Sequence, residues 1–221
     1  MGKKKQETYY SQLFGLPILI DYIEPSKYNK KYITNIINKN YTIQKTRQNW
    51  LKDDFFKTDI HHSNGDEDND KFLKIDYSSL KNSYDKIILK YIKNIYPTKE
   101  VGLSYKIVNY TASKEKTFMA PHNHIDCDFA MVHYIQFDKE HSQTTFQSPY
   151  IHTDMWERGK NIKKYTDSSR IENTWLYPEW QYKMVENQII VFPSILKHYV
   201  RNVASKNLRM TIATNIYLNK A

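Results

Sequence analysis

The 221-residue chain is long enough for one domain with a sizeable core, and 40% hydrophobic with 26% charged residues is an ordinary globular balance. No run of about 18 apolar residues occurs, which excludes a membrane-spanning segment, so no membrane partner is expected. The N-terminus leads into no long apolar segment, and the single cysteine, Cys127, excludes a disulfide within the chain. These features favour a cytoplasmic location.

The formal net charge is +9, a value that is compatible with binding to nucleic acid or other anions. The basic residues are scattered along the chain instead of being gathered on one element. The abundance of Lys, Asn, Ile and Tyr is typical of A/T-rich codon usage, which by itself raises the isoelectric point. The charge alone therefore makes nucleic acid a less favoured partner.

One strand and one helix are predicted near the start of the chain. Residues 11–23 alternate apolar side chains at Leu16, Ile18 and Ile20, which is typical of a strand. Pro25-Ser26 then predicts a helix start with Ser26 as the N-cap. The apolar stripe of this helix is formed by Tyr32, Ile33, Ile36 and Ile37.

A second helix has a continuous apolar face at helical spacing, which indicates core packing. The face is made by Leu80, Tyr84, Ile87, Ile88, Tyr91 and Ile95. Pro97 is expected to end the helix because proline cannot continue its hydrogen bonding.

After Pro97 the composition changes to β-branched and aromatic residues, which favours strands over residues 101–110, 129–137, 188–192 and 207–218. Between these segments, the polar stretch 148–180 predicts a lid or substrate loop. Helices followed by short strands predict an α+β fold, with a double-stranded β-helix (jelly-roll) core buttressed by N-terminal helices. We interpret residues 1–221 as a single domain, with helical support over roughly 25–97 and the jelly-roll core over roughly 101–218.

The segment from Pro121 to Asp128 carries the chemistry. If it continues as a strand, His122, His124 and Asp126 lie on one face, because residues two apart share a face. Imidazole and carboxylate are ligands of non-haem iron(II). A further ligand must come from elsewhere, and His198 is the best candidate. The ligand set is either His122, His124 and His198, or His124, Asp126 and His198.

The other histidines are weaker candidates. His61 and His62 flank an acidic turn and are expected to be exposed. His133 alternates with hydrophobic residues and is expected to face the sheet packing, whereas His141 and His152 lie in polar segments.

The last predicted strand supplies an anion anchor. Arg209 shares one polar face with Thr211 and Asn215, whereas the opposite face is mostly apolar. A buried guanidinium requires an anion, and it matches a carboxylate with two parallel hydrogen bonds. Arg209 follows His198 by eleven residues, so we expect it to hold the distal carboxylate of a cosubstrate near the metal. A surface ion pair of Arg209 is the alternative.

Several segments together resemble a known family. The run from His122 to Tyr134, residues 191–198 and residues 208–215 are similar in order and spacing to motifs of a 2OG-Fe(II) oxygenase family of marine bacteria and phages. Residues 13–18 are similar to the start of that family, and the resemblance spans most of the chain. The chain departs from the family pattern at residues 130–131 and at His133, in the wall of the cosubstrate pocket.

The resemblance implies a jelly-roll dioxygenase that uses iron(II), the cosubstrate 2-oxoglutarate and O2 to hydroxylate a substrate, with release of succinate and carbon dioxide. The family's metal positions match His122, His124 and His198. The family's cosubstrate pocket matches Arg209, with Tyr134 and Asn215 beside it.

The substrate class and two alternative functions stay open. A small molecule or a protein side chain is the favoured substrate, and the sequence predicts no oligomeric state. The first alternative is a nucleic-acid demethylase or base hydroxylase on the same scaffold, which the charge and the aromatic residues of 148–180 would suit. The second is a non-catalytic cupin-like binding module, which complete metal ligands together with Arg209 argue against.

Overall fold

A computed structural model describes residues 8–43, 60–63, 69–97, 100–114, 117–149, 179–201 and 205–219. The strands are β1 (Tyr9–Leu13), β2 (Leu16–Tyr22), β3 (Ile60–His62), β4 (Gly102–Ser113), β5 (Met119–His122), β6 (Phe129–Gln136), β7 (Thr144–Gln147), β8 (Glu179–Gln181), β9 (Gln188–Pro193), β10 (His198–Val200) and β11 (Arg209–Asn219). The helices are the 3-10 helix η1 (Pro25–Lys27), α1 (Lys30–Ile43) and α2 (Ser78–Ile95).

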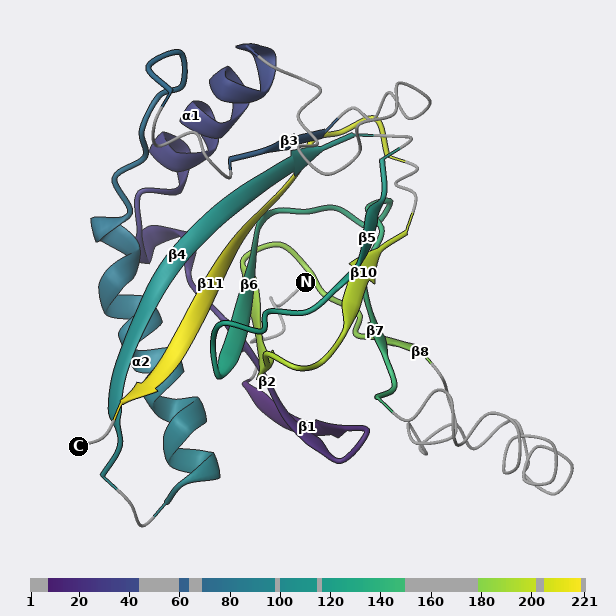
Figure 1. The fold of residues 1–221 in the computed structure, drawn as a ribbon. Helices are drawn as coiled ribbons and strands as arrows, with labels where there is room; N and C mark the ends of the chain where they lie inside the picture. Colours follow the sequence, from purple (N-terminus) through teal and green to yellow (C-terminus); the bar gives the residue numbers. More distant parts are fainter. Residues whose placement is uncertain are drawn as a thin grey trace, which may run out of the picture.

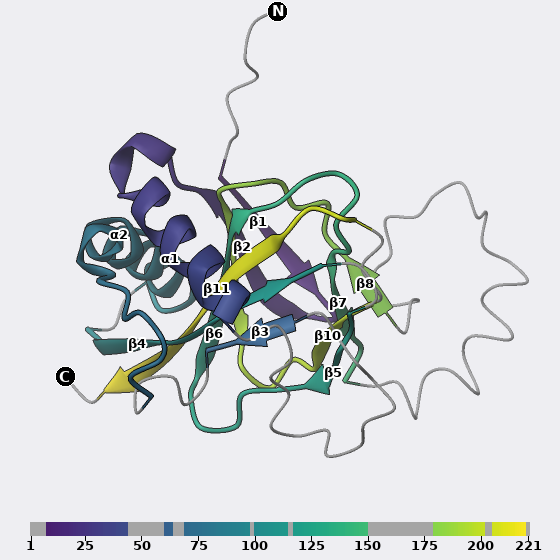
Figure 2. The same ribbon diagram turned by 90° about the horizontal axis from the view of Figure 1, so that it is seen from above.

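The strands form two antiparallel sheets (Figure 1). The large sheet has the order β1-β2-β9-β6-β11-β4-β3, and the small sheet has the order β5-β10-β7-β8. Both helices cover one face of the large sheet, and the small sheet lies on its opposite side (Figures 1 and 2). Because β1, β2 and β3 join the large sheet, that sheet extends beyond the 101–218 core expected from the sequence.

Two hydrophobic cores follow from this arrangement. The first lies between the helices and the large sheet, where the α2 face of Leu80, Tyr84 and Tyr91 is fully buried, as predicted. The second lies between the two sheets, where the ring of Phe146 from β7 packs against that of Phe192 from β9 at a centroid distance of 5.0 Å. Successive side chains of a strand in the large sheet point alternately into the two cores. Such a strand is buried on both faces, and β9 is accordingly buried along its whole length.

The single strand expected over residues 11–23 is instead part of a hairpin of β1 and β2, which pair antiparallel. The turn residues Phe14 and Gly15 have positive φ values of 54° and 79°. These values belong to the tight turns that join two strands directly, and glycine adopts them without strain. The predicted alternation of apolar residues is correct within β2. The hairpin was missed because Phe14-Gly15 is a weak turn signal.

The first helix starts later than predicted, at Lys30, and Ser26 lies in η1 instead of capping α1. Asn29 replaces it, because its side-chain oxygen accepts a hydrogen bond from the Tyr32 backbone N–H at 3.4 Å. The buried stripe contains Ile33, Ile36 and Ile37 as predicted, whereas Tyr32 is exposed.

The strand predictions over residues 101–110, 129–137, 188–192 and 207–218 are confirmed as β4, β6, β9 and β11. Sequence analysis missed the strands of the small sheet, which have only three or four residues each and so show little periodicity. No helix among the described residues is long and apolar enough to cross a membrane. Of the predicted lid, residues 150–178 lie outside the described part of the chain.

The expectation that His61 is exposed is wrong. His61 lies in β3, which pairs with β4, and its side chain is fully buried. Its Nε2 atom lies 3.0 Å from the Tyr110 hydroxyl, and its ring lies 5.1 Å from that of Phe72. Pairing at the sheet edge, not the neighbouring acidic turn, decides the burial of this residue.

Candidate metal centre

Three histidines meet between the two sheets. His122 on β5 and His198 on β10 are paired residues of adjacent antiparallel strands. His124 follows two residues after the end of β5. The possible ligand atoms of all three side chains lie within 4.8 Å of one another. This spacing suits three imidazoles that bind one metal ion.

The strand does not continue through residues 122–126, because β5 ends at His122. A turn follows, in which the His124 backbone N–H donates to the Ser194 carbonyl at 3.0 Å. The Ser194 backbone N–H in turn donates to the Asp128 carbonyl at 3.0 Å. The turn after β9 therefore holds His124 in place, and the two imidazoles converge through this turn and not through strand alternation.

Backbone and side-chain acceptors determine the tautomer of each ring. Nδ1 of His122 lies 2.9 Å from the Ala120 carbonyl, and Nδ1 of His198 lies 3.0 Å from the Leu196 carbonyl. A carbonyl oxygen only accepts, so each Nδ1 must carry the proton. Each Nε2 then carries the lone pair that a metal requires. This is the orientation that hydrogen bonds to the distal nitrogen usually impose on metal-binding histidines.

Burial keeps two of the rings neutral. His198 is 4% exposed, and desolvation together with the neighbouring His122 lowers its pKa to about 3. Desolvation also lowers the pKa of His122, with a smaller contribution from His124. Neutral imidazole is the form that binds metal, so these rings need not lose a proton near neutral pH.

Asp126 lies apart from the histidine cluster. It is exposed on the turn after β5 and is not among the clustered ligand groups of the described residues. The structure therefore brings together His122, His124 and His198, and leaves Asp126 out of the set.

Arg209 lies at the start of β11, where it is 2% exposed. Its Nε has no hydrogen-bond partner among the described residues, and one terminal nitrogen donates to the Thr211 hydroxyl at 3.5 Å. Its guanidinium lies 5.5 Å from the ring centres of both Tyr134 and Phe137. Burial lowers the pKa of Arg209, since desolvation disfavours its charged form. A buried cation without a carboxylate partner fits a ligand that brings an anion.

The guanidinium is close to the metal candidate. A small cavity beside Arg209 is also lined by Met119 and Val200. These two residues pair with each other on β5 and β10, next to the pair formed by His122 and His198. A short ligand that bridges the histidines and Arg209 would therefore lie between the two sheets.

Tyr134 is fully buried, with its ring 5.5 Å from the Arg209 guanidinium, and its hydroxyl donates to the Thr144 hydroxyl at 2.6 Å. Burial raises the pKa of Tyr134, and the nearby Arg209 opposes this shift. Thr144 can pass the hydrogen bond on to an anion. Sequence analysis missed Thr144 because it lies on the short strand β7.

Asn215 lies beside the histidines. Its side-chain oxygen is 2.7 Å from Nδ1 of His124 and accepts a hydrogen bond from it. The Ala120 and Leu196 carbonyls accept the corresponding hydrogen bonds from His122 and His198. The structure thus places Asn215 against a candidate ligand instead of beside Arg209.

Sequence analysis also missed Thr111 and Ser113 on β4, which line the cavity beside Arg209. They are the β4 partners of Thr211 and Arg209. The polar face of the last strand implied polar neighbours across the sheet, but identifying those neighbours required the register.

The remaining described histidines lie elsewhere. His133 is buried, and it faces the helices, with Nδ1 at 3.1 Å from the Tyr84 hydroxyl. His141 is buried in the segment after β6, where Nε2 lies 2.9 Å from the Asn207 carbonyl. His152 lies outside the described residues.

Residues 109–215 match the profile of the family described as "Putative 2OG-Fe(II) oxygenase". The match contains His122, His124, Tyr134, His198, Arg209 and Asn215. No curated protein sequence matches the chain.

Solved structures share the fold at low sequence identity. A prolyl-4-hydroxylase from Pseudomonas putida is 8% identical with a TM-score of 0.51, and the match covers 90% of this chain and 92% of that one. The non-heme alpha-ketoglutarate-dependent epimerase SnoN from nogalamycin biosynthesis is 6% identical with a TM-score of 0.54, and the match covers 90% and 78%. These likenesses confirm the predicted double-stranded β-helix core with helices against one sheet.

An oxidoreductase of the 2OG-Fe(II) oxygenase family from Burkholderia pseudomallei is 14% identical, with a TM-score of 0.40. The match covers 66% of this chain, and the chain spans 60% of that protein's length.

Proposed function

We propose that this chain hydroxylates a substrate as a 2OG-Fe(II) oxygenase that uses iron(II), 2-oxoglutarate and O2, because residues 109–215 match the profile of that family. In this reaction one oxygen atom enters the substrate as a hydroxyl group. The other enters 2-oxoglutarate, which leaves as succinate and carbon dioxide. The observation that carries the proposal is the convergence of three imidazoles whose possible ligand atoms lie within 4.8 Å of one another.

In this proposal His122, His124 and His198 would hold iron(II) through Nε2. The ion would supply the site at which the cosubstrate and oxygen react. The bound cofactors supply the oxidative chemistry, and the protein provides orientation and exclusion of water. The burial of His198 and the packing of Phe146 and Phe192 against its ring support the exclusion of water.

Arg209 would bind the distal carboxylate of 2-oxoglutarate with its unpartnered Nε and one terminal nitrogen. Thr211 orients the guanidinium, and the Tyr134 ring lies against it. The Thr144 hydroxyl, which accepts from Tyr134, would donate to the same carboxylate. In this arrangement the carboxylate would neutralise the buried Arg209 guanidinium, and the cosubstrate would lie between Arg209 and the histidines.

We assign Asn215 a positioning role. By accepting a hydrogen bond from Nδ1 of His124, it would orient Nε2 of that ring toward the metal. This differs from the direct cosubstrate contact expected from the sequence.

The substrate we favour is a small molecule or protein side chain with an apolar part. Two exposed isoleucines support this, Ile125 at 81% and Ile195 at 63% exposure. They lie on the two turns that the hydrogen bond from His124 to Ser194 joins, at the rim of the histidine cluster. An apolar rim suits such a substrate better than a nucleic-acid backbone. We also propose a cytoplasmic location, as the single cysteine favours.

The test measures iron content and turnover in matched variants. Wild-type protein should bind about one iron(II) per chain and release succinate with ascorbate present. His198→Ala and His122→Ala should lose both properties, whereas Asp126→Ala should retain them. Loss of iron in Asp126→Ala with retention in His122→Ala would move the ligand set to the other candidate. Unchanged iron content in His198→Ala would refute the site.

A substrate screen by succinate release separates the functions. Stimulation by small molecules or peptides supports the proposal. Stimulation by methylated oligonucleotides, with salt-dependent binding, would favour the nucleic-acid alternative. Iron binding without succinate release under any condition would favour a binding module.

A further inference from the structure

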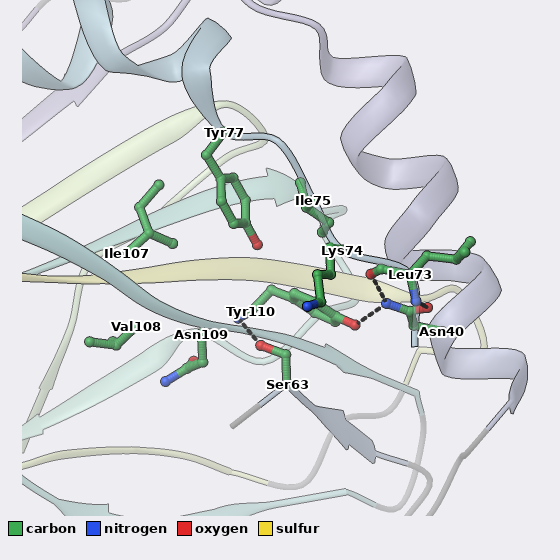
Figure 3. Close-up of a pocket in the computed structure, with 10 residues that line it drawn as sticks. All are labelled: Asn40, Ser63, Leu73, Lys74, Ile75, Tyr77, Ile107, Val108, Asn109 and Tyr110. Atoms are coloured by element: carbon green, nitrogen blue, oxygen red, sulfur yellow. Dashed lines mark hydrogen bonds between the residues drawn. The ribbon is translucent and has the colours of Figure 1, made fainter. Parts of the chain in front are cut away.

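A second cavity, of about 250 Å³, lies on the side of the large sheet away from the histidines (Figure 3). Its walls come from β4, from the segment between β3 and α2, and from α1. Tyr110 on β4 lines this cavity, and the next residue, Thr111, lines the cavity beside Arg209. Successive strand residues point to opposite faces, so the sheet itself separates the two cavities.

The walls of this second cavity are largely apolar. Ile75 and Ile107 line it together with the rings of Tyr77 and Tyr110, and Figure 3 shows the Tyr77 side chain pointing toward Tyr110. The Tyr110 hydroxyl is already engaged, because it accepts from the Asn40 side-chain amide at 2.8 Å and contacts His61. Two aromatic rings and two branched aliphatic side chains favour a flat apolar body over a strongly hydrated one.

Among the described residues, the lining of this cavity carries charge of one sign only. Lys74 is the one ionised side chain among its described lining residues, and no carboxylate is among them. The described residues supply no hydrogen-bond or ion-pair partner for the Lys74 ammonium. One unneutralised cation beside an apolar cavity favours an anionic group on the ligand.

We propose that this cavity binds a small aromatic carboxylate. Its ring lies between the apolar side chains, and its carboxylate faces Lys74. A cavity of about 250 Å³ admits one such molecule but no large ligand. The site is independent of the iron centre and of the cosubstrate anchor.

Binding of phenylacetate to the full-length protein, measured by calorimetry, tests the proposal. Lys74→Met keeps a long side chain and removes the charge, and Lys74 is exposed, so the fold should tolerate it. Lys71→Met is the matched control, since Lys71 is exposed on the same segment but does not line the cavity. We expect Lys74→Met to weaken phenylacetate binding about threefold or more, as expected for a partly solvated ion pair, and Lys71→Met to leave it unchanged.

Two further measurements identify the site. Phenylacetamide, which has no charge, should bind wild type and Lys74→Met equally weakly. Arg209→Met should bind phenylacetate as wild type does. No detectable binding of phenylacetate to wild type would overturn the proposal. Equal binding by wild type and Lys74→Met would also overturn it, and loss in Arg209→Met would place the ligand at the cosubstrate anchor instead.

Discussion

The buried guanidinium of Arg209 leads to a prediction in which two effects on stability have opposite signs. Removing a buried cation that has a carboxylate partner usually destabilises a protein by about 3–5 kcal/mol. Arg209 is 2% exposed, yet its Nε has no partner among the described residues. Replacing a whole buried ion pair by apolar side chains of similar volume is neutral or stabilising by roughly 1–4 kcal/mol, and removing a buried cation that has no counter-charge should have the same sign. We therefore expect Arg209→Met to keep or raise the melting temperature of the protein without cosubstrate.

The cosubstrate should reverse this order. With 2-oxoglutarate at about 100 times its dissociation constant, binding stabilises the wild type by about 2.7 kcal/mol. For a chain of this size, that corresponds to an increase in melting temperature of roughly 5–11 °C. Arg209→Met should show almost none of this increase. Arg209→Lys keeps the charge but loses the two-pronged geometry, so its half-saturating 2-oxoglutarate concentration should rise at least about tenfold, or about 1.4 kcal/mol.

Thermal unfolding followed by circular dichroism, with anaerobic iron(II) and with or without 2-oxoglutarate, measures both effects. Iron content should be unchanged in both variants, because Arg209 is not a proposed ligand. The reasoning is refuted if Arg209→Met loses about 3 kcal/mol or more without cosubstrate while 2-oxoglutarate still stabilises it. That result would mean that Arg209 belongs to a structural ion pair.

Three other predictions concern the residues around the site. Asn215→Ala should weaken iron(II) binding about 10–100-fold in a metal titration, because the His124 ring loses its acceptor, whereas Asn215→Asp should largely retain affinity. Burial lowers the pKa of His133 to about 3, below the value of about 6.5 in an unfolded chain, so the unfolded state binds more protons between these pH values. Between pH 6.5 and 5, wild type should therefore lose roughly 2 kcal/mol more unfolding free energy than His133→Leu in urea titrations, and parallel pH profiles would contradict this. Thr144→Val should cost about 1–2 kcal/mol of unfolding free energy by leaving the Tyr134 hydroxyl without its acceptor, and Thr144→Ser should be close to wild type.

The long elements of the fold were predictable from the sequence, because each has a strong local pattern. The apolar face of α2 repeats at helical spacing over its whole length, and β9 is a continuous apolar run. The polar and apolar faces of β11 also follow from alternation, which is why Arg209 was recognised as inward-facing. Short strands and turns carry too little pattern, and the hairpin at Phe14 and the strand β10 were therefore missed.

The candidate ligands were predictable from their residue types, but the strand alternation used to place His124 beside His122 does not hold. The sequence identified His122, His124 and His198 as metal-ligand candidates, because two histidines share strand spacing and imidazole is a ligand of iron(II). It did not exclude Asp126, because strand alternation would have placed that carboxylate on the same face. The end of β5 at His122 and the turn held by Ser194 decided the geometry, and both depend on contacts with β9 and β10.

Tertiary structure also decided which groups lack partners. By itself the sequence determined that Arg209 points inward, because side-chain direction in a strand is a local property of the backbone. That Nε of Arg209 has no partner in the described part of the chain, that Asn215 faces His124, and that Tyr134 is bonded to Thr144 are all results of the tertiary structure. Such contacts are created by strand register and by the packing of the two sheets, and no local pattern encodes either of them.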